Sequence, residues 1–170
     1  MKSRLIRKSP RRKQYDYGSS WCYFVTICTQ DRIHCFGEIV GAGLALTDIG
    51  KICDQEIQRM MSLRHDLEMR EYIIMPNHIH LLFSFGSLMV EASHNPTKEY
   101  SNQTLSSIVW SLKSAVIREC NKQWLENWLW SFTRQRSFHD HIVRNQQEFD
   151  RIKYYIQTNP QSRESDTFNK

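Results

Sequence analysis

His78 and His80 have the spacing that points most directly to chemistry. In a β-strand the side chains at positions i and i+2 emerge on the same face, so these two imidazoles would lie side by side. Two adjacent imidazoles can bind a divalent cation. Ile79, Leu81 and Phe83 alternate with them and supply the opposite, core-facing side. The pair predicts a metal site, with two histidines that merely pack on a strand face as the alternative.

Tyr155 is the second residue with possible chemistry. The apolar residues that define the buried stripe of a C-terminal helix are Phe149, Ile152 and Ile156. At about 100° per residue, Tyr155 falls roughly 90° from this stripe, whereas Tyr154 points almost directly away from it. Asn159 follows Tyr155 by four positions and shares its face. The pair predicts a nucleophile beside a possible metal ligand, and a boundary residue of an amphipathic helix is the alternative for Tyr155.

These side chains need a sheet and several helices to position them. Alternation, aromatic content and turn residues predict strands over 21–29, 68–75, 78–85 and 138–144, and a short hairpin within 36–44. Helical spacing and capping residues predict helices over about 47–62, from Leu105 to about Cys120, and from the Asn145 cap to about Thr158. The order predicts an α+β, ferredoxin-like antiparallel sheet with helices on one face, plus a C-terminal helix, which is the helix that carries Tyr155.

Length and composition favour one globular domain. The chain has 170 residues, 40% of them hydrophobic and 24% charged. No apolar run approaches the roughly 18 residues that a membrane span requires, so we expect a cytoplasmic protein with no membrane partner. The five cysteines form no CxxC pair and are expected to be reduced core thiols. We expect a basic arm over 1–17, one domain over 18–160 and a polar tail over 161–170, with a surface loop over 86–103 and a tryptophan cluster at 124, 128 and 130.

The positive charge is concentrated at the N-terminus. Residues 1–14 hold seven of the 23 basic residues and no acidic one, whereas the rest of the chain is close to neutral. Such an arm suits contacts with nucleic-acid phosphates, and the tyrosines at its end suit base stacking. The expected DNA-binding residues are Arg4, Arg7, Lys8, Arg11, Arg12, Lys13, Tyr15 and Tyr17. A disordered, solubilising tail is the alternative.

Three segments together resemble a known family. They are Met75 to Leu81 (MPNHIHL), Asp140 to Asn145 (DHIVRN) and Tyr154 to Pro160 (YYIQTNP). This combination, with the stretch over 11–17 and the first strand, resembles the REP-associated tyrosine transposases, which belong to the single-tyrosine His-hydrophobic-His (HUH) nucleases. The resemblance covers most of residues 11–160. A single His-x-His pair is a weak signal, but MPNHIH followed by YxxxNP in this order is a strong one.

The resemblance implies a site and a reaction. His78 and His80 would bind Mg²⁺ or Mn²⁺, Tyr155 would be the nucleophile, and Asn159 would be the third ligand at a position where relatives often have Gln. The implied substrate is single-stranded or hairpin DNA, cleaved through a 5′-phosphotyrosine by a bacterial monomer or homodimer. Possible accessory residues are His139, Asp140, His141 and Arg151. Because His139 and His141 form a second His-x-His pair, the choice between the two pairs stays open, as does the group that accepts the tyrosine proton.

The same residues exclude or disfavour several other classes of protein. A two-histidine phosphoesterase is excluded because no histidine is followed two positions later by Ser or Thr. A cupin-like site lacks the expected Glu after the His pair. A double-tyrosine relaxase is disfavoured because Tyr154 and Tyr155 are about 100° apart on a helix. The remaining rival is a DNA- or RNA-hairpin-binding regulatory protein that has the same fold but does not cleave.

Overall fold

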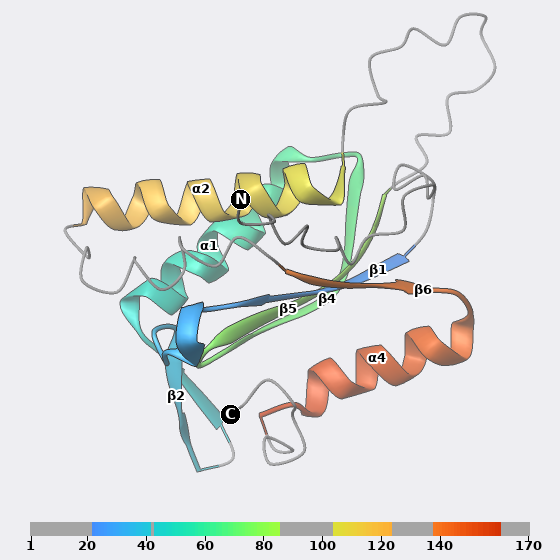
Figure 1. Ribbon diagram of the computed structural model, residues 1–170, viewed down its shortest axis with the longest axis horizontal. Coiled ribbons are helices and arrows are strands. Elements are labelled where there is room, and N and C mark those ends of the chain that lie inside the picture. Colours follow the sequence, from blue (N-terminus) through green and yellow to red (C-terminus); the bar gives the residue numbers. More distant parts are fainter. Residues whose placement is uncertain (1–21, 42, 86–103, 124–137, 161–170) are drawn as a thin grey trace, which may run out of the picture.

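The computed structural model of the chain describes residues 22–41, 43–85, 104–123 and 138–160 (Figure 1). The basic arm, the loop over 86–103, the tryptophan cluster and the C-terminal tail lie outside these ranges, so the predictions made for them stay predictions. The division of the chain into arm, domain and tail stays a prediction for the same reason.

A four-stranded antiparallel sheet forms the centre of the molecule. Its strands are β1 (Cys22–Cys28), β4 (Leu67–Met75), β5 (His78–Phe85) and β6 (His139–Val143). They are arranged in the order β4-β5-β1-β6, and each neighbouring pair is antiparallel. This order confirms the predicted ferredoxin-like arrangement, in which the first and third strands of the fold lie side by side at the centre.

Helices cover both faces of the sheet. Helix α1 (Asp48–Leu63) and helix α2 (Leu105–Lys122) lie on one face, and helix α4 (Gln146–Thr158) lies on the other (Figure 1). A separate hairpin, β2 (Gly37–Val40) and β3 (Gly43–Leu46), precedes α1 and confirms the hairpin expected there; a short 3-10 turn, η1 (Gln30–Arg32), follows β1. Within the described ranges, no helix is long and apolar enough to cross a bilayer.

The start of α1 depends on two local features. Thr47, the first residue of the helix predicted over about 47–62, is its N-cap, and its hydroxyl accepts a hydrogen bond from the Gly50 amide at 3.2 Å. A Cβ atom on Gly50 would lie 2.0 Å from the carbonyl oxygen of Phe36. Only glycine therefore allows the first turn of α1 to pack this closely against the backbone that leads into β2.

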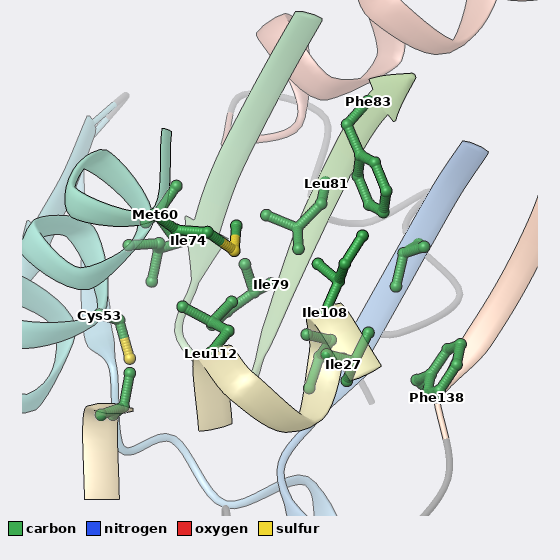
Figure 2. Packing of buried hydrophobic residues seen from close by; sticks show 14 of the residues in the cluster. Ile27, Cys53, Met60, Ile74, Ile79, Leu81, Phe83, Ile108, Leu112 and Phe138 are labelled. Carbon is green, nitrogen blue, oxygen red and sulfur yellow. The ribbon is translucent and has the colours of Figure 1, made fainter. Parts of the chain in front are cut away.

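The main core lies between the sheet and helices α1 and α2. Ile79, Leu81 and Phe83 are all fully buried in it, which confirms the predicted core-facing side of β5. Figure 2 shows Ile108 and Leu112 of α2 among the sheet residues of this cluster. All five cysteines are free thiols, as expected. Because such a core is close-packed, truncation of Leu81 to Ala is expected to cost about 2–5 kcal/mol.

A smaller cluster joins α4 to the opposite face. Its buried members are Leu82, Val143, Ile152 and Ile156. Phe149 packs against them from the first turn of the helix, so the predicted apolar stripe of α4 is confirmed. Leu82 belongs to the same face of β5 as the two histidines, because residues two apart on a strand share a face. Helix α4 therefore covers the face that carries His78 and His80.

Candidate active site

His78 and His80 are both 0% exposed and lie beneath α4. Their Nε2 atoms are 3.1 Å apart, and their ring planes are inclined at 67°. Strand alternation predicted that the two rings share a face, but not that they are fully buried. The burial results from the packing of α4, which comes from a segment about 70 residues further along the chain.

The other nitrogen of each imidazole contacts a neighbouring polar side chain. His78 Nδ1 lies 2.6 Å from Asn77 Oδ1, and His80 Nδ1 lies 2.8 Å from Thr26 Oγ1. Thr26 is the cross-strand partner of His80 in the β1–β5 register. With both Nδ1 atoms engaged in this way, the two Nε2 atoms converge.

Tyr155 reaches this pair from α4. Its hydroxyl oxygen is 3.4 Å from His80 Nε2, and its ring centroid is 5.4 Å from that of His80. Phe24 of β1 packs against the rings of both His80 and Tyr155. Its contact with Tyr155 is edge-on, with the ring centroids 6.2 Å apart. Tyr154 is 68% exposed. The two tyrosines therefore have the helical faces that the sequence predicts, and only Tyr155 lies against the histidines.

Asn159 is the C-cap residue of α4 and is 1% exposed. Neither polar atom of its side-chain amide has a hydrogen-bond partner in the described part of the chain. An unsatisfied buried amide typically costs about 1–3 kcal/mol, so such groups usually have a partner. A bound ligand that contacts the amide would remove this cost.

The donor set fits a divalent cation in part. Among the described residues no group of three or more His, Cys, Asp and Glu side chains could bind a metal, so the His78–His80 pair supplies two ligands of these types and no third. Two adjacent ligands of an octahedral cation lie about 3 Å apart, close to the separation of the two Nε2 atoms. Mg²⁺ prefers oxygen ligands, whereas imidazole nitrogens are better suited to first-row transition ions.

The second His-x-His pair lies on the same sheet face but is arranged differently. In the β1–β6 register His139 pairs with Thr26 and His141 pairs with Phe24. Both histidines are exposed, and His141 Nε2 is 2.8 Å from Glu148 Oε1. The Nε2 atoms of His78 and His80, in contrast, lie 3.1 Å apart, and the Tyr155 hydroxyl lies beside them.

The other two possible accessory residues are Asp140 and Arg151. Asp140 pairs with Val25, whose side chain belongs to the main core, so Asp140 lies on the sheet face opposite to the histidines. Arg151 is exposed on α4.

Both ends of α4 are tied to the sheet. Asn145 Oδ1 accepts a hydrogen bond from the Glu148 amide at 2.8 Å, and Glu148 Oε2 accepts one from the Arg144 amide at 2.8 Å. The first bond confirms the cap predicted at Asn145, whereas the return bond of the Glu148 carboxylate goes to the Arg144 amide and not to the Asn145 amide, so the capping box is only half formed. The hydrogen bond from Arg144, together with His141, lowers the pKa of Glu148. Near the other end, Gln157 Nε2 donates to Glu71 Oε2 of β4 at 2.7 Å. These contacts position Tyr155 along the sheet.

The basic residues of α2 lie on the far side of the sheet from Tyr155, because α2 and α4 cover opposite faces (Figure 1). Burial lowers the pKa of Lys113 to about 8, and Lys122 pairs with Glu119 at 2.9 Å. The residues expected to bind DNA in the basic arm are outside the described ranges. The contribution of the arm to binding therefore stays a prediction.

Sequence reasoning missed three residues of the site, which are Phe24, Thr26 and Asn77. Phe24 and Thr26 are two positions apart on β1, so the sequence could predict that their side chains share a face. It could not predict which strand they would lie next to. Asn77 falls in the gap between the strands predicted over 68–75 and 78–85 and within the MPNHIHL segment, and neither observation indicates where its side chain lies. Its buried side chain becomes evident only when the turn is seen next to the His78 ring.

Comparisons with known proteins agree with this fold. No family model matches the chain. An uncharacterized protein of Haemophilus influenzae (strain Rd) is 31% identical over 163 residues, which covers 91% of this chain and 88% of the relative. The structure of a REP-associated tyrosine transposase bound to a REP hairpin is similar with a TM-score of 0.60 at 19% identity, covering 91% of this chain and 74% of that one.

A putative transposase from Deinococcus radiodurans has a TM-score of 0.45 at 16% identity, covering 87% of this chain and 98% of that one. The chain has the REP-associated tyrosine transposase fold, as the resemblance implied. It belongs to the same family as the Haemophilus influenzae protein.

Proposed function

We propose that the protein is a metal-dependent endonuclease and transposase that cleaves and rejoins single-stranded DNA at hairpin elements. The main support for this proposal is the position of the Tyr155 hydroxyl. It lies 3.4 Å from His80 Nε2, beside the convergent His78–His80 pair. The fold shared with a REP-associated tyrosine transposase supports the same class of reaction.

His78, His80 and Asn159 would bind the cation, Mn²⁺ or Mg²⁺. When bound, it would supply Lewis-acid polarisation of the scissile phosphate. The convergence of the two Nε2 atoms and the unsatisfied Asn159 amide support this assignment. Burial of the pair beneath α4 would also keep water away from the reacting groups.

Tyr155 would act as the nucleophile. Its phenolic oxygen attacks the phosphorus atom, the bond from phosphorus to the 3′ oxygen breaks, and that oxygen takes a proton to become a free 3′-OH. The DNA stays attached through a 5′-phosphotyrosine, and attack by a 3′-OH reverses the step. A free phenol has a pKa of about 10, so its proton must pass to an acceptor. In this proposal His80 Nε2 is a ligand without a spare lone pair, so the acceptor is another group.

Hairpin DNA is the proposed substrate. The structural neighbour is bound to a REP hairpin, and the basic arm of this chain supplies phosphate-binding cations next to Tyr15 and Tyr17. The arm would bind the hairpin foot while Tyr155 reaches a phosphate in the adjoining single strand.

One assay separates a nuclease from a binding protein. The full chain is incubated with end-labelled hairpin DNA carrying single-stranded flanks, with Mn²⁺, with Mg²⁺ or with EDTA, and is then denatured. We expect a labelled protein–DNA adduct with either cation and none with EDTA. Binding of the hairpin without an adduct under any condition would instead indicate the non-cleaving regulatory protein.

A further inference from the structure

Asn77 is buried, and the conformation of its backbone does not explain why this position is an asparagine. It forms, with Pro76, the two-residue turn between β4 and β5, in which Met75 pairs with His78. Asn is favoured in such turns because it tolerates a positive φ. Among the described residues the non-glycine positions with positive φ are Asp31 and Arg32, so Asn77 has an ordinary φ. The explanation must therefore come from its side chain.

Hydrogen bonds from other segments hold the turn in place. Both the amide and the hydroxyl of Thr29 donate to the Asn77 carbonyl, at 2.9 and 3.0 Å, and the Phe36 amide donates to the Pro76 carbonyl at 3.0 Å. With its backbone anchored in this way, Asn77 presents Oδ1 to His78 Nδ1 at 2.6 Å. An amide oxygen can only accept, so His78 carries its proton on Nδ1 and its Nε2 has the lone pair that a cation requires.

Thr26 holds the second imidazole with a different kind of group. Its side chain is 2% exposed in the middle of β1, and Oγ1 lies 2.8 Å from His80 Nδ1. A hydroxyl can donate or accept after a simple rotation. Thr26 can therefore bond to His80 when Nε2 donates toward His78 Nε2, 3.1 Å away, and also when Nε2 acts as a ligand.

We propose that Asn77 and Thr26 are positioning residues that aim His78 and His80 at one cation through their Nδ1 atoms. Asn77 holds His78 in a single tautomer, and Thr26 supports His80 in either tautomer. This inference rests on the proposed function, because it assigns the outer contacts of the same metal site. Outer contacts of this kind typically change metal affinity by about 10- to 100-fold.

Paired variants and two measurements test the inference. In the metal-free full chain, ¹⁵N-labelled histidine reports by NMR which ring nitrogen carries the proton. Calorimetric titration with Mn²⁺ then measures affinity. Asn77→Leu and Thr26→Val remove the polar group, whereas Asn77→Asp and Thr26→Ser retain an acceptor or a hydroxyl. Ser84→Ala is the control, because it removes a hydroxyl from the same face of β5 without touching either Nδ1 contact.

We expect His78 to carry its proton on Nδ1 in the wild type and in Asn77→Asp, and to lose this preference in Asn77→Leu. Mn²⁺ affinity should fall at least about tenfold in Asn77→Leu and Thr26→Val, and by less than about threefold in Asn77→Asp, Thr26→Ser and Ser84→Ala. Unchanged tautomers together with unchanged affinity in folded Asn77→Leu and Thr26→Val would overturn the inference.

Failure of the proposed function gives a different result. If the wild type binds no Mn²⁺, the metal site itself is wrong, whereas the NMR spectra still show whether Asn77 selects the His78 tautomer. If Asn77→Leu does not fold, the Mn²⁺ affinities of Thr26→Val and Thr26→Ser test the inference. Equal affinities in these two variants would then overturn it.

Discussion

The hydroxyl oxygen of Tyr155 lies 3.4 Å from Nε2 of His80, although 75 positions separate the two residues in the chain. The contact joins a helix on one face of the sheet to the central strand beneath it. It makes the predicted nucleophile a neighbour of the predicted metal ligand, and mutations on each side of the contact should have separable effects.

Tyr155→Phe should abolish the covalent adduct and leave hairpin binding within about twofold, because only the attacking oxygen is removed. Tyr154→Phe is the matched control. It removes a hydroxyl from the neighbouring position, which is 68% exposed, and should remain active. Denaturing gels of labelled DNA measure both variants. The opposite pattern would identify Tyr154 as the nucleophile.

His78→Ala and His80→Ala should each lose Mn²⁺ binding by more than about tenfold and lose cleavage, because each removes one of three proposed protein ligands. His139→Ala is the control, because it removes an exposed imidazole from the same sheet face. Calorimetry and the adduct assay report the two effects. A site built on the other pair would be indicated if His139→Ala were inactive and His78→Ala active.

Asn159→Leu should weaken Mn²⁺ binding without destabilising the metal-free protein. The buried amide has no hydrogen-bond partner in the described structure, so an apolar side chain of similar size is expected to be neutral or to stabilise by up to about 1 kcal/mol. Urea unfolding with and without Mn²⁺ separates the two effects. A clear loss of metal-free stability would mean that the amide is already bonded in the folded chain.

Glu148→Gln should reduce stability at neutral pH and have little effect in acid. The pKa of Glu148 is lowered from its ordinary 4.5, chiefly by the hydrogen bond from the Arg144 amide and then by His141. A folded-state pKa below the unfolded one gives stabilisation that is complete above 4.5 and is lost as the pH falls through the folded value.

Urea unfolding of the wild type and Glu148→Gln across this pH range measures the effect. Glu38→Gln, at an exposed site on β2, is the control. An equal difference between wild type and Glu148→Gln at every pH would exclude a role for the charge.

Deletion of residues 2–13 should weaken hairpin binding and flatten its salt dependence, while circular dichroism stays the same. Each lost phosphate contact lowers the slope of log K against log salt by about 0.7 for single strands and 0.9 for duplex DNA. Binding titrations at several salt concentrations measure the slope. An unchanged affinity and slope would make the arm a solubilising tail.

Local sequence patterns were sufficient for the elements and for the faces of each element. Alternation placed Ile79 and Leu81 in the core, and helical spacing separated Tyr155 from Tyr154. Asn145 identified the start of α4. These predictions succeeded because each depends on the geometry of one continuous segment, whose period of 2 or 3.6 residues is set by the backbone itself.

The tertiary structure decided which faces meet. Only the β1–β5 register puts Thr26 opposite His80, and only the β1–β6 register puts His139 and His141, and not Asp140, on the sheet face of His80. Burial of His78 and His80 depends on α4 packing on the sheet face that α1 and α2 leave uncovered. Register and packing arise from contacts between segments far apart in the chain, and a one-residue slip would reverse every face. The amino-acid sequence therefore determined the chemistry that each face carries, whereas the long-range pairing of those faces determined which groups form the site.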